Sequence, residues 1–219
     1  MKQAVIVTGG TVDFKFALSY IKEQKPEITA AVDAGMEFFL KAGEKPDVIV
    51  GDFDSVKPET LNFFKGQQGI DWLTLVPEKD DTDTEAAIRE VIRRGCKKIH
   101  ILGATGSRLD HVLSNIGLLG MGFSSGEEIL IVDPCNRIRM VEKGISIKKE
   151  EQFGDYVSLL PFTPKVSGLT LKGMKYPLFQ YEYSCFSSLG ISNEIVGDEA
   201  EITFSQGILL VIESKDRQK

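Results

Sequence analysis

Two acidic side chains stand close together in the sequence GDFDS, residues 51–55, where Asp52 and Asp54 follow an apolar run. In an extended strand, residues two positions apart project to the same side, so the two carboxylates are expected to converge if the strand continues. Two negative charges at short distance repel unless water surrounds them, one keeps a proton, or a cation lies between them. A solvated turn is the simpler interpretation of this pair alone, so other residues must distinguish it from a cation site.

Polar or glycine-rich segments follow other apolar runs in the first part of the chain, at residues 8–10, 33–35, 78–83 and 103–111. If these runs are parallel strands, the segments line one crevice, because ligands bind beyond the carboxyl ends of such strands. Asp80 and Asp83 then join Asp52 and Asp54 as hard oxygen ligands, the kind that Mg²⁺ prefers. Zinc is disfavoured, because the chain has two histidines and scattered cysteines. A solvated acidic turn and a helix start are the alternatives for these two acids.

Glycine and basic residues in the same region predict a phosphate site. Gly9, Gly10 and the segment beginning at Asp33 permit a close backbone approach to a phosphate or a nucleoside. If a helix opens near Arg108, then Arg108, His111 and Asn115 lie on one helical face at its positive end. The alternative is a glycine-rich turn with ordinary polar surface. Neither a Walker A loop nor a G-x-G-x-x-G motif occurs.

The elements that must position these residues change in type along the chain. Apolar runs at residues 4–7, 29–32, 47–50, 72–76, 99–102 and 129–132 alternate with helical patterns, including a capping box at residues 82–85. This alternation predicts an α/β domain with a mostly parallel, Rossmann-like sheet covered on both faces. From Arg137 onward, short β-rich runs separated by Gly, Pro or Asn predict an antiparallel β-sandwich. We therefore expect two domains, residues 1–136 and 137–219, with a cleft between them.

Composition limits the class of protein. The chain has 219 residues, a net charge of −6 and a pI near 5.1, which argue against a nucleic-acid-binding or anionic-membrane surface. Its three cysteines have no C-x-x-C spacing and predict reduced thiols. There is no signal-peptide pattern, and no apolar stretch approaches the roughly 20 residues that cross a bilayer. We expect a cytoplasmic protein without membrane segments.

The ordered motifs GDFDS, KDDTDTEAA, GATGSRLDH and GISNE resemble the thiamine pyrophosphokinase family, over about residues 5–212. The resemblance implies an N-terminal α/β catalytic domain, a C-terminal β-sandwich that binds thiamine, and a homodimer with the thiamine site at the subunit interface. It also implies Mg²⁺-dependent transfer of pyrophosphate from ATP to thiamine, with release of AMP. Ser107 replaces a glycine that the family usually has in the third motif, so the backbone approach there is expected to differ.

The resemblance also implies roles for single residues. Asp52, Asp54, Asp80 and Asp83 correspond to acids that bind Mg²⁺ and the ATP phosphates, with Arg108 beside them in the catalytic set. Arg108, Asp110 and His111 correspond to the motif beside the phosphates. We expect Gly9, Gly10, Asp33 and Thr105 to complete the nucleotide-binding positions. The thiamine-binding positions are Asn115, Tyr176, Ser192 and Asn193. Which acid acts as general base is not determined by the sequence.

Two other functions are compatible with parts of the sequence. The catalytic half alone would suit a pyrophosphokinase that acts on another hydroxymethyl heterocycle, such as a pterin; the GISNE segment and the aromatic residues of the β-rich half favour thiamine. A non-catalytic nucleotide- or thiamine-binding regulator is the second alternative. All four acids are present, which favours an enzyme because binding alone does not require so concentrated a metal site.

Overall fold

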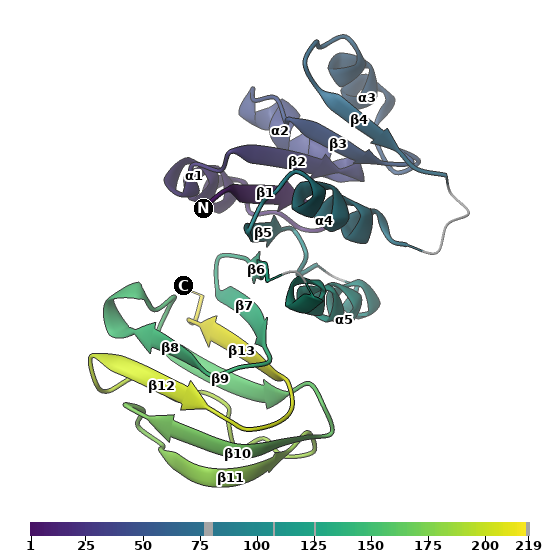
Figure 1. Ribbon diagram of the computed structural model, residues 1–219. Coiled ribbons are helices and arrows are strands. Elements are labelled where there is room, and N and C mark those ends of the chain that lie inside the picture. The colour runs from purple at the N-terminus through teal and green to yellow at the C-terminus, as the bar shows by residue number, and fades with distance from the viewer. Residues whose placement is uncertain (77–80, 107, 125, 218–219) are drawn as a thin grey trace. The chain divides into compact units, whose positions relative to one another are not determined.

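A computed structural model describes residues 1–76, 81–106, 108–124 and 126–217. These residues form two compact units, Met1–Asp133 and Pro134–Lys219 (Figure 1). The sequence analysis places the domain boundary between residues 136 and 137, slightly further along the chain. Among the described residues, no helix combines the length and apolar character that a membrane crossing needs. Cys96, Cys135 and Cys185 form no disulfide with one another.

The first unit is built on a parallel sheet with the strand order β4-β3-β2-β1-β5-β6. The strands are β1 (Gln3–Val7), β2 (Ile28–Val32), β3 (Val48–Gly51), β4 (Asp71–Thr74), β5 (Lys98–Leu102) and β6 (Glu128–Val132). The chain runs outward from β1 to β4 and then returns to β5 on the other side of β1. The order therefore reverses between β1 and β5, which is where such sheets bind ligands.

Helices cover both faces of this sheet. They are α1 (Phe14–Gln24), α2 (Met36–Ala42), α3 (Pro58–Lys65), α4 (Asp83–Arg93) and α5 (Leu109–Leu118), with short 3₁₀ turns η1 (Asp33–Gly35) and η2 (Leu119–Ser124). Helices α1 to α3 lie on one face and α4 lies on the other (Figure 1). Right-handed crossover connections require this arrangement, because the chain moves across the sheet in one direction from β1 to β4 and in the opposite direction from β4 to β5. Because both faces are covered, the inner strands are continuous apolar runs, such as Ala4–Val7 in β1, whose side chains are fully buried.

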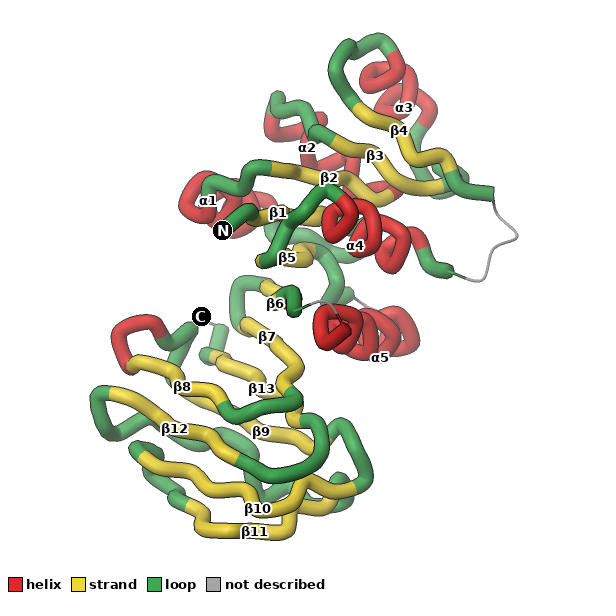
Figure 2. The backbone as a smooth tube through the Cα atoms, viewed as in Figure 1, coloured by secondary structure: helices red, strands yellow, loops and turns green. Residues whose placement is uncertain are grey.

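The second unit is an antiparallel β-sandwich. One sheet has the order β7-β13-β9, and the other has the order β11-β10-β12-β8. The strands are β7 (Asn136–Val141), β8 (Ile145–Lys148), β9 (Tyr156–Pro161), β10 (Lys165–Lys172), β11 (Leu178–Ser184), β12 (Glu199–Thr203) and β13 (Leu209–Ser214). Figure 2 shows strands and loops almost throughout, with one short helical turn, η3 (Lys149–Glu151). Their inward side chains, among them Val157, Leu169, Tyr183 and Val211, form one apolar core.

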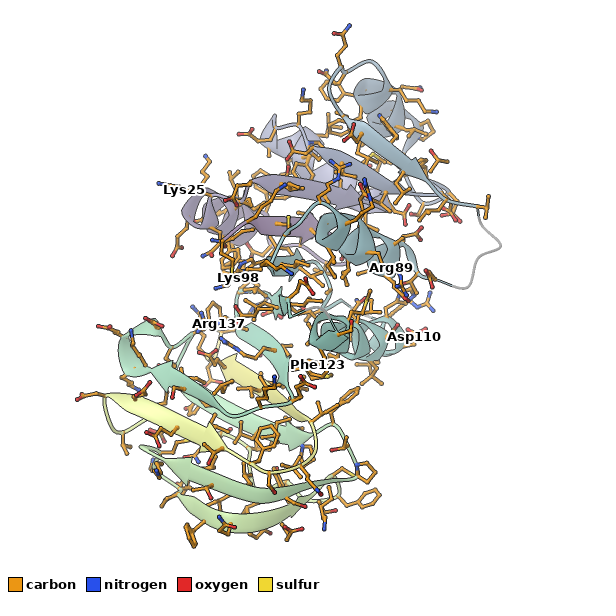
Figure 3. The ribbon with its side chains drawn as sticks, viewed as in Figure 1. Lys25, Arg89, Lys98, Asp110, Phe123 and Arg137 are labelled. Atoms are coloured by element: carbon orange, nitrogen blue, oxygen red, sulfur yellow. The ribbon has the colours of Figure 1, made fainter. Side chains whose placement is uncertain are left out.

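A buried ion pair joins strands β7 and β13 of the sandwich. The Glu213 side chain is fully buried and accepts hydrogen bonds from Arg137 Nε at 2.9 Å and Arg139 Nη2 at 2.7 Å. The backbone N–H of Phe153 donates a further hydrogen bond, at 2.9 Å. Arg137 is labelled on β7 in Figure 3. With a fourth hydrogen bond from Arg137 Nη2 at 2.6 Å, the buried carboxylate is satisfied, so replacing Glu213 alone would leave two guanidinium groups without this partner.

Candidate functional site

The carboxyl ends of the parallel strands surround a cleft of about 870 Å³ in the first unit. It lies at the switch point between β1 and β5, as the strand order predicts. The cleft is lined by residues 8–11, 32–34, 52, 55, 81–84, 103, 104, 106, 108, 111, 114 and 115. Eight of the sequence-predicted site residues are among them: Gly9, Gly10, Asp33, Asp52, Asp83, Arg108, His111 and Asn115.

Two glycine-containing loops meet at the base of the cleft. Thr8 continues β1 by donating its backbone N–H to the Leu102 carbonyl at 2.9 Å, which joins the ends of β1 and β5. Beyond this bond, the backbones approach so closely that a β-carbon on Gly10 would overlap the Gly103 carbonyl. Gly103 itself has a φ of +79°, in the region that favours glycine. These glycines are therefore required by packing between the loops, in addition to any ligand that the loops bind.

Asp33 lies among the acids of the cleft, at the carboxyl end of β2. Its Oδ1 accepts a hydrogen bond from the Phe53 backbone N–H at 3.3 Å, and its carboxyl group shares a hydrogen bond with that of Asp83. Burial first, and then the charge of Asp83, raise the pKa of Asp33 to about 7, and the charge of Asp52 adds to this effect. Asp33, Asp52 and Asp83 thus form a crowded group from three different elements.

The segment after β3 differs from the extended geometry that the sequence suggests. Strand β3 ends at Gly51, and Phe53 takes a left-handed backbone conformation with φ of 68°. Asp54 then folds back, and its N–H donates to Asp52 Oδ1 at 3.2 Å. Asp52 lines the cleft, whereas Asp54 is exposed and is not among the lining residues. The expected convergence of the two carboxylates depended on a strand that does not continue past Gly51.

The start of α4 brings Asp83 to the cleft. Thr82 is the N-cap residue, and its Oγ1 accepts the Glu85 backbone N–H at 3.2 Å, as the predicted capping box requires. In a complete capping box, the Glu85 carboxylate would accept the Thr82 backbone N–H. Here the Glu85 carboxylate pairs instead with Arg89, one turn along the helix. Asp83 occupies the first helical position, where the helix dipole favours an acid. The predicted ligand Asp80 lies outside the described residues.

Arg108 is the N-cap residue of α5, so the helix begins where the sequence predicts. Among the described residues that line the cleft, it carries the only Arg or Lys side chain. Its Nε donates to Asp110 Oδ1 at 3.2 Å, and this pairing lowers the pKa of Asp110 to about 2. Asp110 projects from the first turn of α5 (Figure 3), is 63% exposed, and does not line the cleft. It contacts the guanidinium group instead.

Two predicted ligand residues hold the loop after β5 in place. The hydroxyl of Thr105 donates to Asp133 Oδ2 at 2.7 Å, and Thr105 is not among the residues that line the cleft. Asn115 lines the cleft, but its Nδ2 donates to the Ala104 carbonyl at 3.1 Å. Both side chains therefore fix the backbone of the loop. The sequence gives no signal for the Thr105 contact, because Asp133 lies 28 residues further along the chain.

The three remaining predicted residues lie in the second unit. Tyr176 and Ser192 are exposed, and Asn193 is 4% exposed. Ser192 has a φ of 55°, and its N–H donates to Ser158 Oγ at 2.9 Å. Asn193 Oδ1 accepts from the Tyr176 N–H at 3.0 Å, and Nδ2 donates to the Tyr176 carbonyl at 2.9 Å. The structure therefore brings the three residues together, in one segment and the turn beside it.

Asp33 is predicted from the sequence to bind the nucleotide, whereas in the structure it belongs to the acidic group with Asp52 and Asp83. The available signal was its position, directly after β2, which matches that of Asp52 after β3. Ser55, Thr84 and Ser114 also line the cleft and were not predicted, whereas Asp81 belongs to the segment 78–83 that was expected to line it. As they stand, no three His, Cys, Asp or Glu side chains in the described part of the chain are arranged to hold a metal ion.

Comparison with known proteins assigns both units to one family. Residues 19–131 match the family described as thiamin pyrophosphokinase, catalytic domain, and residues 143–209 match thiamin pyrophosphokinase, vitamin B1 binding domain. The chain is 34% identical to the thiamine pyrophosphokinase of Bacillus subtilis (strain 168) over 218 residues, which is 99% of this chain and 100% of that protein.

Solved structures agree with this assignment. The crystal structure of the Bacillus subtilis thiamine pyrophosphokinase has a TM-score of 0.87 and 33% identity, covering 99% of this chain and 100% of that one. The crystal structure of the Geobacillus thermodenitrificans thiamin pyrophosphokinase has a TM-score of 0.84 and 31% identity, covering 99% of each chain. The chain therefore belongs to the thiamine pyrophosphokinase family.

Proposed function

We propose that this protein transfers the pyrophosphoryl group of ATP to the hydroxyl group of thiamine, forming thiamine diphosphate and AMP. The observation that carries the proposal is the cleft at the β1/β5 switch point. It gathers acids, glycine loops and a guanidinium group at one place, in a chain of this family. Transfer of this kind depends on positioning and on neutralising charge, and the lining residues supply groups for both.

The acidic group fits a divalent cation by its chemistry. Asp33, Asp52 and Asp83 offer hard oxygen atoms. Burial raises the pKa of Asp33 most, and the charges of Asp83 and Asp52, which a cation would offset, raise it further. We propose that Asp52 and Asp83, with Asp54 and Asp80 from the adjoining segments, hold Mg²⁺, and that Asp33 supports them. When bound, Mg²⁺ supplies positive charge to the phosphate oxygens. One carboxylate of this group accepts the proton of the attacking hydroxyl.

The other side of the cleft is suited to the phosphates of ATP. Four glycines of the loops after β1 and β5, Gly9, Gly10, Gly103 and Gly106, line this side, and Arg108 and His111 lie at the start of α5. Arg108 is 69% exposed and, among the described residues, forms an ion pair only with Asp110. Its guanidinium group can therefore turn to a phosphate group without leaving a buried partner. We propose this role for Arg108, with the thiamine hydroxyl attacking the β-phosphorus in line with the departing AMP.

Thiamine recognition is proposed for the second unit. The match to the vitamin B1 binding domain covers residues 143–209, which include Tyr176, Ser192 and Asn193. An aromatic ring such as Tyr176 attracts the cationic thiazolium ring. Asn115 is proposed to face thiamine from the cleft, through the part of its side chain that does not bind Ala104.

We also propose that the protein is a cytoplasmic homodimer with the thiamine site at the subunit interface. The second unit exposes several large apolar side chains between residues 179 and 196: Phe179 (83% exposed), Phe186 (96%), Leu189 (53%), Ile191 (45%) and Val196 (66%). Such a group of exposed apolar residues is typical of an interface. A second copy of the chain is the occupant that the family resemblance implies.

A turnover assay distinguishes this function from its alternatives. Purified protein is incubated with ATP, Mg²⁺ and either thiamine or a hydroxymethylpterin, and the nucleotide and vitamin products are separated by chromatography. Thiamine diphosphate and AMP with thiamine alone support the proposal. Product with the pterin only would favour the related pyrophosphokinase, and binding of ATP and thiamine without any product would favour a non-catalytic regulator.

A further inference from the structure

The segment that carries Ser192, residues 190–194, is held from both sides by backbone hydrogen bonds. On one side it pairs with the edge of β9: Leu159 N–H donates to the Gly190 carbonyl at 2.8 Å, and Val157 exchanges two bonds with Asn193, at 2.8 and 3.1 Å. On the other side, the Lys175 N–H donates to the Glu194 carbonyl at 2.9 Å. The segment is therefore a rigid connection between β9 and the turn that precedes β11.

Ser192 is kept in an unfavourable backbone conformation by one buried side chain. Its φ of 55° is uncommon for a residue with a β-carbon. Ser158 of β9 is 7% exposed, and its Oγ accepts the Ser192 N–H at 2.9 Å. This conformation leaves the Ser192 side chain exposed. Ser158 itself is covered, so it is poorly placed to contact a ligand.

Asn193 uses its side chain almost entirely within the protein. Its Oδ1 accepts two hydrogen bonds, from Tyr176 N–H at 3.0 Å and from Glu194 N–H at 2.9 Å, which occupy both acceptor sites of that oxygen. Its Nδ2 donates to the Tyr176 carbonyl at 2.9 Å. The amide therefore binds both the N–H and the carbonyl of Tyr176. Tyr176 itself is 58% exposed.

We propose that Ser158 and Asn193 are positioning residues of the thiamine pocket, which rests on the function proposed above. Neither meets the substrate through its own side chain. Ser158 fixes the backbone of Ser192, Asn193 fixes that of Tyr176, and the two exposed side chains are thereby oriented before thiamine binds. Pre-ordered contacts of this kind improve affinity because less freedom is lost on binding. Disturbing either positioning residue therefore weakens thiamine binding specifically.

Two substitutions test this inference. Asn193→Asp keeps the shape and the acceptor oxygen but places a second oxygen against the Tyr176 carbonyl. Ser158→Ala removes only the acceptor for Ser192. For each variant, we expect the KM for thiamine to rise by about tenfold or more. The KM for ATP and the kcat at saturating thiamine are expected to change by less than about twofold. Thermal unfolding is measured on the same samples.

The matched control is Thr163→Val, in the same sandwich. Thr163 Oγ1 donates to the Lys165 carbonyl at 2.9 Å and accepts the Ile208 N–H at 3.1 Å, so this variant also loses side-chain-to-backbone bonds. Its Tm is expected to fall while the KM for thiamine stays at the wild-type value.

The outcomes separate this inference from the proposed function. If the wild-type enzyme forms no thiamine diphosphate, the proposed function fails. If the wild type is active, and both variants lower Tm without raising the KM for thiamine more than Thr163→Val does, the positioning role is wrong. Should Asn193→Asp fail to fold, Ser158→Ala alone decides, because it removes a single hydrogen bond and creates no new charge.

Discussion

The hydroxyl of Thr105 donates a hydrogen bond of 2.7 Å to Asp133 Oδ2, which links the loop after β5 to the end of β6. From the opposite end, Asn115 of α5 binds the neighbouring Ala104 carbonyl. This loop, which contributes Gly103, Ala104 and Gly106 to the cleft, is therefore tied to two elements of its own unit. Thr105 itself does not line the cleft.

Thr105→Val tests the importance of this link. Valine has nearly the same shape but cannot donate to Asp133, so we expect the KM for ATP to rise by roughly fivefold to tenfold, equivalent to about 1 kcal/mol. Thr105→Ser keeps the hydroxyl and should behave like the wild type. Steady-state kinetics at saturating thiamine provide the measurement. Identical behaviour of the valine and serine variants would show that the hydrogen bond does not support nucleotide binding.

Gly51→Ala tests the packing around Asp33. Gly51 has a φ of +152°, and a β-carbon there would overlap Asp33 Oδ1, so the carboxylate must move. We expect kcat to fall by about tenfold or more, because the acidic group is displaced. Gly43→Ala, at the end of α2, is the control: its φ is +67° and its β-carbon would have open space. It should cost about 1 kcal/mol of stability and leave kcat unchanged. Equal kinetics for the two variants would contradict the account.

The sequence was sufficient where a pattern depends on local chemistry. The parallel strands are buried on both faces, so they appear in the sequence as apolar runs. These runs predicted the strands of the sheet and the polar segments that follow them. Thr82 caps α4 and Arg108 begins α5 as expected. Strand β11 has no clear strand pattern in the sequence: it follows Pro177, its residues 179–182 are exposed, and Gln180 interrupts it with a φ of 50°.

Side-chain roles within the site depend on tertiary contacts that no local pattern contains. The left-handed backbone of Phe53 separates Asp54 from Asp52, although the spacing in the sequence suggests a pair. Asp33 joins Asp83 across 50 positions of the chain, which only the fold brings together. Residues 77–80 and Ser107 lie outside the description, so the roles of Asp80 and of the missing glycine stay predictions.

The acid stability of the first unit is expected to depend on Glu90. Hydrogen bonds from Arg93 at 2.8 Å and Arg94 at 2.6 Å lower the pKa of Glu90 from 4.5 to about 2. A lowered pKa stabilises the folded state above pH 4.5, and this contribution disappears as pH falls toward 2. Glu90→Gln should therefore reduce the free energy of unfolding by about 1 kcal/mol or more near neutral pH. Urea unfolding between pH 3 and 7 measures the difference in unfolding free energy between the wild type and Glu90→Gln. This difference is expected to narrow below pH 4.5. A difference that stays constant over the whole range would contradict the role given to Glu90.

Mixed dimers test the proposed interface site. Asp83→Asn and Tyr176→Ala chains, carrying different affinity tags, are co-expressed, and the species with one chain of each kind is purified. If each site combines the first unit of one chain with the second unit of the other, one site in this dimer carries both changes and the other carries neither. We then expect about half of the wild-type activity. Activity no greater than that of the two single-variant proteins would place each site within one chain.

The proposed reaction breaks the bond between the α- and β-phosphates of ATP and transfers the β- and γ-phosphates to thiamine. ATP labelled at its γ-phosphorus is supplied with Mg²⁺ and thiamine, and the products are separated and counted. We predict labelled thiamine diphosphate and unlabelled AMP in equal amounts, with no product when thiamine is omitted, because attack occurs at the β-phosphorus. Labelled thiamine monophosphate together with ADP, or ATP consumption that does not depend on thiamine, would contradict the account.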